Sequence, residues 1–291
     1  MPRGLDHIVH AVRNLDAAAD LYRRLGFTVG ARNRHPWGTH NHIVQFSGFF
    51  IELLTLAEPD KLGSDGFSTL FGVYNRDFIA RGEGLSVLVL ESKDARADES
   101  EFAAAGVLSA PTMRFEREGK RPDGAPVKVG FSLTFAEDQA APNIRFTTCQ
   151  QHYPENFWNP AFQRHANGTT GIAGIVVVGN QPDHHAHFFE TFTGGSADAN
   201  DGGFTIKTPR GMVDMLTPAA FTHRFGVKGP DVSAGPRLAA LRFATDNTSA
   251  IEALPEQAGI AGIFAGNPTV VGAGDAMGAV LTFEAAAREP R

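Results

Sequence analysis

The sequence is poor in cysteine, with Cys149 as the single thiol in 291 residues. One cysteine cannot form an internal disulfide, and it excludes zinc sites and redox pairs built on a CxxC pair. No Lys or Arg stands beside it to lower the thiol pKa, so we expect a small buried hydrophobe there. Sulfur chemistry is not predicted.

The sequence also lacks a basic excess and long apolar runs. The net charge is −6 and the pI is near 6.0, which disfavours binding to a polyanion such as nucleic acid. No apolar run approaches the roughly 20 residues that cross a bilayer, so no membrane partner is expected. The first four residues lead directly into the apolar segment 5–12 and leave no room for a signal peptide, which predicts a cytoplasmic protein.

Tyrosine and tryptophan are scarce, whereas phenylalanine is abundant. There are 3 Tyr and 2 Trp against 23 Phe. Apolar rings in this number are typical of cores and of apolar pocket walls. The composition therefore hints at a cavity for an apolar ligand.

Internal similarity is the most informative feature of the sequence. A strand-like run at 5–12 is followed by Asp16, a helical apolar pattern and Gly26, and a run at 172–178 is followed by Asp183, a similar helical pattern and Gly194. We expect Asp16 and Asp183 to be N-cap residues, because an Asp side chain accepts hydrogen bonds from free amides of the first turn. Each passage continues into two more strand-like runs, which lie at 42–46, 49–56, 204–208 and 211–216.

Two weaker copies fill the remaining length, at 85–149 and 238–283. The chain is thus predicted to be an α+β protein with four βαβββ modules, paired into two cup-shaped, mainly antiparallel sheet domains. We place the domains at 1–152 and 171–291. The Pro- and aromatic-rich stretch 153–170 is expected to be a packed connection, and 66–81 a helical insertion.

These segments resemble a known family. The similarity lies in Leu5-Asp6-His7-Ile8-Val9, Gly38-Thr39-His40-Asn41, Ile51-Glu52-Leu53, Arg121-Pro122-Asp123-Gly124, and the block from Cys149 through His152-Tyr153-Pro154-Glu155 to Asn167-Gly168. With them the chain resembles the glyoxalase-like domain proteins of the vicinal oxygen chelate superfamily, which also includes bleomycin-resistance proteins and extradiol dioxygenases. The resemblance implies that paired modules curl into a cup whose floor can hold a divalent metal.

The resemblance implies metal ligands at His7 on a first strand, at Glu52 on a last strand, and at His152 just after the last strand of the second module. Glu52 stands among Phe49, Phe50, Ile51, Leu53 and Leu54. A carboxylate in such apolar surroundings is costly unless it is paired, hydrogen-bonded or bound to a cation. Two imidazoles and a carboxylate with open positions suit Fe(II), Mn(II), Ni(II) or Zn(II). The alternatives are a hydrogen-bonded structural histidine and a salt bridge from Glu52 to an arginine.

The chain departs from the family pattern at the other first strands. Ser86, Gly174 and Ala240 stand where further ligands would fall, although Asp214 matches Glu52. A complete four-ligand site is not expected. The C-terminal pair of modules is interpreted as a scaffold or as the interface of a homodimer.

Polar residues on two turns are candidates for substrate contact. Thr39, His40 and Asn41 enter a strand from which alternate side chains reach the cup, so we expect Thr39 and Asn41 to bind substrate, and Glu52, His40 and Asn41 to take part in catalysis. Arg121 is a candidate to clamp a substrate carboxylate. Both segments also read as ordinary turns.

Two functions follow from these residues. The first is a metal-assisted enzyme that acts on a small vicinally oxygenated substrate, as an isomerase, a lyase or a dioxygenase. The second is a metal-free protein that binds or sequesters a small molecule in the same cup.

Overall fold

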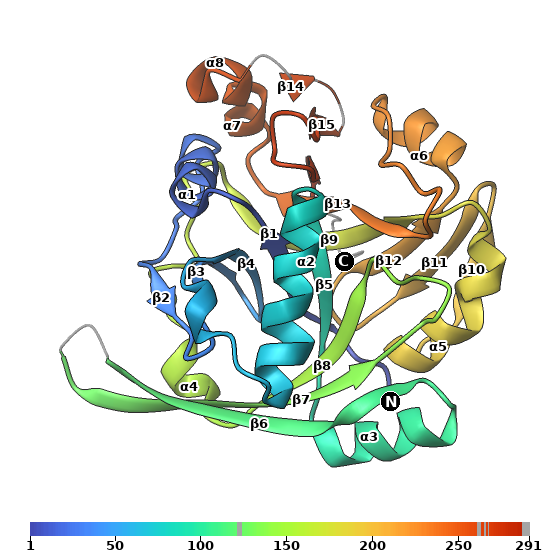
Figure 1. The fold of residues 1–291 in the computed structure, drawn as a ribbon. Coiled ribbons are helices and arrows are strands. Elements are labelled where there is room, and N and C mark those ends of the chain that lie inside the picture. The colour runs from blue at the N-terminus through green and yellow to red at the C-terminus, as the bar shows by residue number, and fades with distance from the viewer. Residues whose placement is uncertain (121–123, 261–262, 265, 267, 287–291) are drawn as a thin grey trace, which may run out of the picture.

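The protein is built on two eight-stranded sheets, each made of two βαβββ modules (Figure 1). The computed structural model describes residues 1–120, 124–260, 263–264, 266 and 268–286. The first sheet contains β1 Leu5–Ala11, β2 Asn33–Arg34, β3 Thr39–Phe46, β4 Phe49–Leu56, β5 Gly84–Glu91, β6 Leu108–Lys120, β7 Pro126–Ala136 and β8 Arg145–Gln151. The second contains β9 Thr169–Val178, β10 Ala197–Asn200, β11 Gly203–Lys207, β12 Met212–Leu216, β13 Arg237–Thr245, β14 Ile263–Phe264, β15 Thr269–Val271 and β16 Val280–Ala285.

The helices connect the strands within modules or are insertions between them. They are α1 Leu15–Arg24, α2 Tyr74–Arg81, α3 Ala95–Ala104, α4 Pro154–Phe157, α5 Ala186–Thr193, α6 Pro218–Phe225, α7 Thr248–Glu252 and α8 Leu254–Ala258, with η1 Pro59–Lys61, η2 Ser68–Val73 and η3 Pro182–His185. Among the described residues, no helix is both long and apolar enough to cross a membrane.

The strand order shows how the modules pair. The first sheet runs β2-β3-β4-β1-β5-β8-β7-β6, and the second runs β10-β11-β12-β9-β13-β16-β15-β14. In both sheets the first strand of a module is parallel to the last strand of the same module and antiparallel to the first strand of the partner module. The predicted α+β class and paired modules are confirmed.

The predicted helix caps were wrong by two residues. Asn14, not Asp16, caps α1: its backbone is extended and its side chain accepts a hydrogen bond from the amide of Ala17. Asp183 lies inside η3, and the residue before η3 is Gln181. Asp16 instead lies in the first helical turn, where a carboxylate favours the positive end of the helix dipole.

A β-bulge shifts the expected position of the ligand in the second module. Val9 pairs with Val87 and His10 pairs with Leu85, so Ser86 is the extra residue. Ser86 donates a hydrogen bond to Asn75 of α2. Counted back from the capping residues of the helices that follow, the equivalent of His7 is therefore Val87, which offers no metal donor either.

The two sheets share one hydrophobic core, which holds buried residues of both. Phe27, just after α1, lies 5.1 Å from Phe243 of β13 between ring centroids. Phe146 of β8 lies 4.6 Å from Phe188 of α5. The two sheets are therefore joined by close aromatic packing.

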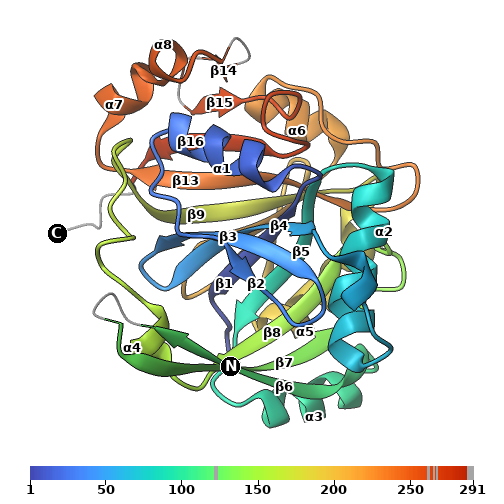
Figure 2. The same cartoon turned by 60° about the vertical axis from the view of Figure 1, so that its left-hand side comes forward.

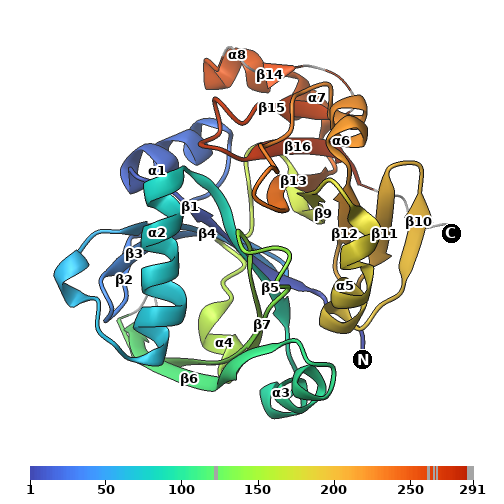
Figure 3. The same ribbon diagram turned by 45° about the vertical axis from the view of Figure 1, so that its right-hand side comes forward.

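The insertion and the connection close the first sheet into a cup. The segment η2–α2 packs against β4 and β1 and stands across the open side of the sheet (Figures 1 and 3). The helix α4 lies against β7 near the start of that strand, where Asn156 donates to the carbonyl of Lys128 (Figure 2). Gln45 anchors the connection, since its side chain donates to the carbonyl of Phe157 and accepts from the amide of Asn159.

Candidate functional site

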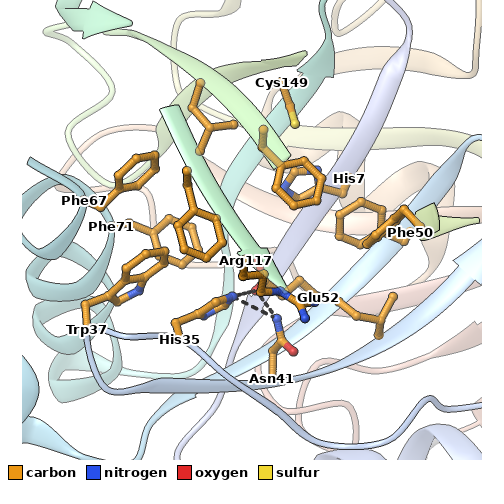
Figure 4. Close-up of a pocket in the computed structure, with 15 residues that line it drawn as sticks. His7, His35, Trp37, Asn41, Phe50, Glu52, Phe67, Phe71, Arg117 and Cys149 are labelled. Carbon is orange, nitrogen blue, oxygen red and sulfur yellow. Dashed lines mark hydrogen bonds and ion pairs between the residues drawn. The ribbon is translucent and has the colours of Figure 1, made fainter. Parts of the chain in front are cut away.

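The candidate site is a cavity of about 90 Å³ inside the cup of the first sheet (Figure 4). Seven of the residues that line it are aromatic hydrocarbon or indole rings: Trp37, Phe50, Phe67, Phe71, Phe115, Phe131 and Phe157. They come from β4, β6 and β7, from the segment before β3, and from the insertion and the connection. The polar groups among them are His7, His35, Asn41, Glu52 and Arg117.

Glu52 of β4 is buried in this cavity and held by its neighbours. Its Oε1 accepts a hydrogen bond from the Nδ2 of Asn41 at 2.5 Å and lies 3.8 Å from the Nε2 of His35. Asn33 donates to the Oδ1 of Asn41, which fixes the orientation of that amide. One carboxylate oxygen of Glu52 thus has a donor, and no described residue hydrogen-bonds the other.

His35 is a neutral base beside this carboxylate. Burial lowers its pKa, and Arg117 and His40 lower it further, whereas Glu52 acts in the opposite direction. Its Nδ1 donates to the hydroxyl of Thr39 at 2.8 Å, and its ring stacks on Trp37. Because Asn41 approaches the Nε2 as a donor, that nitrogen is an acceptor.

Arg117 of β6 supplies the positive charge of the site. Its guanidinium makes no hydrogen bond or ion pair within the described part of the chain, although its electrostatic interaction with Glu52 is favourable. Partial burial lowers the pKa of Arg117, but a guanidinium remains charged at neutral pH. The indole N–H of Trp37 is likewise buried without an acceptor among the described residues.

His7 lies at another part of the cavity wall (Figure 4). Its ring stacks on Phe50 with a centroid separation of 4.2 Å, and its Nδ1 bonds the carboxylate of Asp6 at 2.5 Å. Asp6 is held in turn by Gln151. The β1–β4 register pairs Val9 with Glu52, so His7 and Glu52 face the same side of the sheet.

The third predicted metal ligand is not brought to this site. His152 does not line the cavity, and its Nε2 bonds the hydroxyl of Ser132. No three His, Cys, Asp or Glu side chains in the described ranges are arranged to hold a metal ion. The predicted set of His7, Glu52 and His152 therefore does not fit a three-ligand metal site.

The predicted turn residues are separated by the alternation of β3. Asn41 lines the cavity, and Thr39 stands behind it as the partner of His35. His40 points to the other side, where its Nε2 bonds Glu58. Arg121 lies outside the described residues.

Three residues of the site were missed from the sequence: His35, Trp37 and Arg117. His35 and Trp37 lie in an irregular segment with no periodic pattern. Phe115 and Arg117 share the inner face of β6, but the charge of Arg117 breaks the alternation of apolar and polar residues that predicts a strand.

Cys149 lines the cavity as an inert group. Burial raises the pKa of its thiol well above the usual value, and the charges of Asp6 and Glu52 raise it further. A thiol in this state is a poor nucleophile.

Paired βαβββ modules that form cups around an internal cavity define the fold class of the vicinal oxygen chelate superfamily. The model of the glyoxalase-like domain family matches residues 5–193, which is most of the chain. The chain belongs to this family. No curated protein matches it significantly in sequence.

Solved structures share the fold at low sequence identity. A hypothetical protein from Staphylococcus aureus has a TM-score of 0.68 at 13% identity, over 97% of this chain and 99% of that one. A mutant of 4-hydroxymandelate synthase from Streptomyces coelicolor has a TM-score of 0.58 at 13% identity, over 91% and 77%. A xylose isomerase-like TIM barrel/4-hydroxyphenylpyruvate dioxygenase fusion protein has a TM-score of 0.52 at 16% identity, over 90% of this chain and 39% of that one. At such identities the likeness concerns the fold alone.

Proposed function

We propose that the cup of the first sheet binds a small vicinally oxygenated molecule through protein groups alone, with an apolar head no larger than one ring. The apolar head lies among the aromatic walls. An anionic oxygen binds Arg117, and an adjacent hydroxyl or amine donates to Glu52.

The observation that carries this proposal is the guanidinium of Arg117, which lines an aromatic cavity and makes no hydrogen bond or ion pair in the described part of the chain. A guanidinium binds a carboxylate through two parallel hydrogen bonds, and such charge-assisted bonds are the strong ones. The oxygen of Glu52 that no described residue hydrogen-bonds supplies the complementary acceptor, and the indole N–H of Trp37 supplies a further donor. Small-molecule sites typically have apolar walls and a small number of polar groups that point toward the ligand.

The volume of the cavity limits the apolar head. An engineered apolar cavity of about 150 Å³ takes one benzene ring. The present cavity, at about 90 Å³, is smaller and needs a small outward movement of its walls to admit a ring. Fused ring systems are therefore expected to bind poorly.

Titration calorimetry with benzoate, phenylacetate, mandelate and phenyllactate tests the proposal. We expect mandelate and phenyllactate, which carry neighbouring oxygens, to bind more tightly than benzoate. Arg117→Ala is expected to weaken binding about 10- to 100-fold, the value of a charge-assisted bond. Arg114→Ala is the matched control, because Arg114 is exposed on the other face of the same strand.

Two results would contradict the proposal. One is that none of the four acids binds to the folded protein. The other is that Arg117→Ala and Arg114→Ala have equal effects on the dissociation constants.

One observation favours the metal-assisted alternative. His7 and Glu52 face the same cavity, and Asp6 holds the Nδ1 of His7 as a carboxylate holds a metal-binding imidazole. Metal analysis after aerobic and anaerobic purification separates the two functions. Stoichiometric Fe, Mn, Ni or Zn that is lost in Glu52→Ala would support the metal-assisted enzyme and overturn binding through protein groups alone.

A further inference from the structure

We infer that an open groove next to the cavity is a second subsite, which binds an uncharged, hydrogen-bonding tail on the same ligand. This inference rests on the proposed function. The groove has a volume of about 640 Å³ and shares Ile43, Arg117 and Phe157 with the inner cavity. A ligand seated at Arg117 therefore reaches both spaces.

The lining of the inner cavity continues along the strands into the groove. Along β3, Asn41 lines the inner cavity, Ile43 lines both spaces and Gln45 lines the groove. Since alternate residues of a strand share a face, this is one continuous surface.

The strand β6 repeats this order on the facing side. Phe115 lines the inner cavity, Arg117 lines both spaces and Gly119 lines the groove. Arg117 thus stands at the neck between two compartments, with its charge available to a group that passes through.

The inner cavity is too small to hold more than the head of a ligand, so any further part of the molecule must extend past Arg117. The groove offers room there because Gly30, Ala31 and Gly119 are small. Its opposite wall is formed by the connection, with Trp158, Pro160 and Phe162.

The residues that line the groove indicate which kind of ligand tail it can bind. Apart from Arg117, its one charged lining residue in the described part of the chain is Glu155. Side-chain amides and aromatic rings make up much of the rest. Gln45 is bonded to the connection, whereas the Oδ1 of Asn33 and the Nδ2 of Asn159 have no hydrogen-bond partner among the described residues. Because Glu155 is the one charged lining residue that the structure describes besides Arg117, such walls suit a peptide-like chain that carries amide groups and no net charge.

A pair of ligands tests the second subsite. N-acetylphenylglycine presents a ring, a carboxylate and a short acyl group, whereas N-(acetylglycylglycyl)phenylglycine adds an uncharged peptide tail. On the unmodified protein we expect the longer ligand to bind about tenfold more tightly, a gain of about 1.4 kcal/mol.

Substitutions in the groove then locate the tail. Gly119→Trp fills the groove without touching the inner cavity, and the nearest neighbour of an added Cβ is Val127 at 3.4 Å. We expect it to abolish the tenfold gain of the longer ligand and to leave mandelate binding within about twofold. Ala31→Trp, at an exposed position outside the strands, is expected to act in the same way. Glu118→Trp on the outer face of β6 is the control and should preserve the gain.

The outcomes separate the two proposals. If mandelate binds in an Arg117-dependent manner but the two phenylglycine ligands bind equally, the second subsite is overturned and the proposed function stands. The subsite is also overturned if Gly119→Trp retains the gain. If mandelate and both phenylglycine ligands fail to bind, the proposed function itself fails.

Discussion

Glu52 is held in the cavity by one donor and a nearby positive charge, which leave one of its oxygens available for a ligand. Asn41 bonds one oxygen directly, and Arg117 acts at longer range. Removing one partner of a buried hydrogen bond leaves the other with an uncompensated loss of hydration. The contact between Asn41 and Glu52 is therefore a test of how the site is stabilised.

We expect Asn41→Leu to lower the free energy of unfolding by about 1–3 kcal/mol, because it leaves a buried carboxylate without its donor. Urea denaturation measures this loss. The double variant Asn41→Leu, Glu52→Leu removes both partners and should recover part of the stability. Equal or greater destabilisation in the double variant would show that this contact is not what holds the carboxylate.

Two buried histidines outside the site link stability to pH. His10 bonds the hydroxyl of Tyr22 and the carbonyl of Met277, and His165 accepts from the amide of Thr28 and donates to the carbonyl of Gln45. The ring of His165 must be neutral because its Nδ1 accepts an N–H, and burial lowers the pKa of both histidines. The unfolded chain therefore binds more protons than the folded protein below the ordinary histidine pKa of about 6.5.

The sign follows from this difference in proton binding. The stability due to these neutral histidines is fully present above pH of about 6.5 and is lost as the pH falls below that value. We expect the free energy of unfolding, measured in urea, to fall between pH 7 and pH 5. His165→Gln keeps an acceptor and a donor but no titration, so it should show a shallower fall. An identical slope would assign the pH dependence to other groups.

Residue-level reasoning found part of the site. The apolar neighbours of Glu52 on β4 correctly marked a carboxylate that needs partners, and Asn41 on β3 reaches it diagonally, two residues from Ile43, which pairs with Glu52. The contribution of Arg117 could not be read in this way, because β6 and β4 are distant in the sequence and are not adjacent in the sheet. Only the curvature of the sheet brings them to one cavity.

At the scale of elements, the cap of α1 offers a direct test. Asn14 accepts from the amide of Ala17, whereas Asp16 points to solvent and pairs with Arg32. We expect Asn14→Ala to lower the free energy of unfolding by about 1 kcal/mol, the usual value of an N-cap side chain. Asp16→Ala should cost less, since exposed ion pairs contribute little. Urea denaturation measures both losses. A larger loss for Asp16→Ala than for Asn14→Ala would show that Asp16 is the cap.

The repeated modules were readable from the sequence because each strand and helix carries its own apolar period. The irregularities in the strands could not be predicted in this way. The bulge at Ser86 adds one residue without disturbing the apolar run of β5, so its position is visible only in the pairing with β1. The strand β6 was missed because Arg117 on its inner face interrupts the expected alternation of apolar and polar residues.

At the scale of the whole molecule, the shared core raises the question of whether the two sheets unfold separately. Sequence reasoning placed separate domains at 1–152 and 171–291, and this division stays a prediction. Phe27 contacts both Phe243 and Phe283, and Phe46 contacts Phe243. If one sheet unfolded alone, these rings would be exposed to water, which costs about 25 cal/mol of free energy for each Å² of apolar surface. We therefore predict that the two sheets unfold as one cooperative unit.

The positions of the two tryptophans make this prediction measurable. Trp37 and Trp158 both precede the second sheet, so their fluorescence reports on the first cup. Phe225 of α6 packs in a cluster made only of residues from Val176 onward, and Phe225→Ala should cost about 3 kcal/mol through the cavity it leaves. If the sheets unfold together, Phe225→Ala shifts the tryptophan transition and the far-UV circular dichroism transition to the same lower urea concentration. A variant whose circular dichroism moves while its tryptophan transition stays in place would show two independent domains, and the aromatic contact between the sheets would then add little to the stability of the cup.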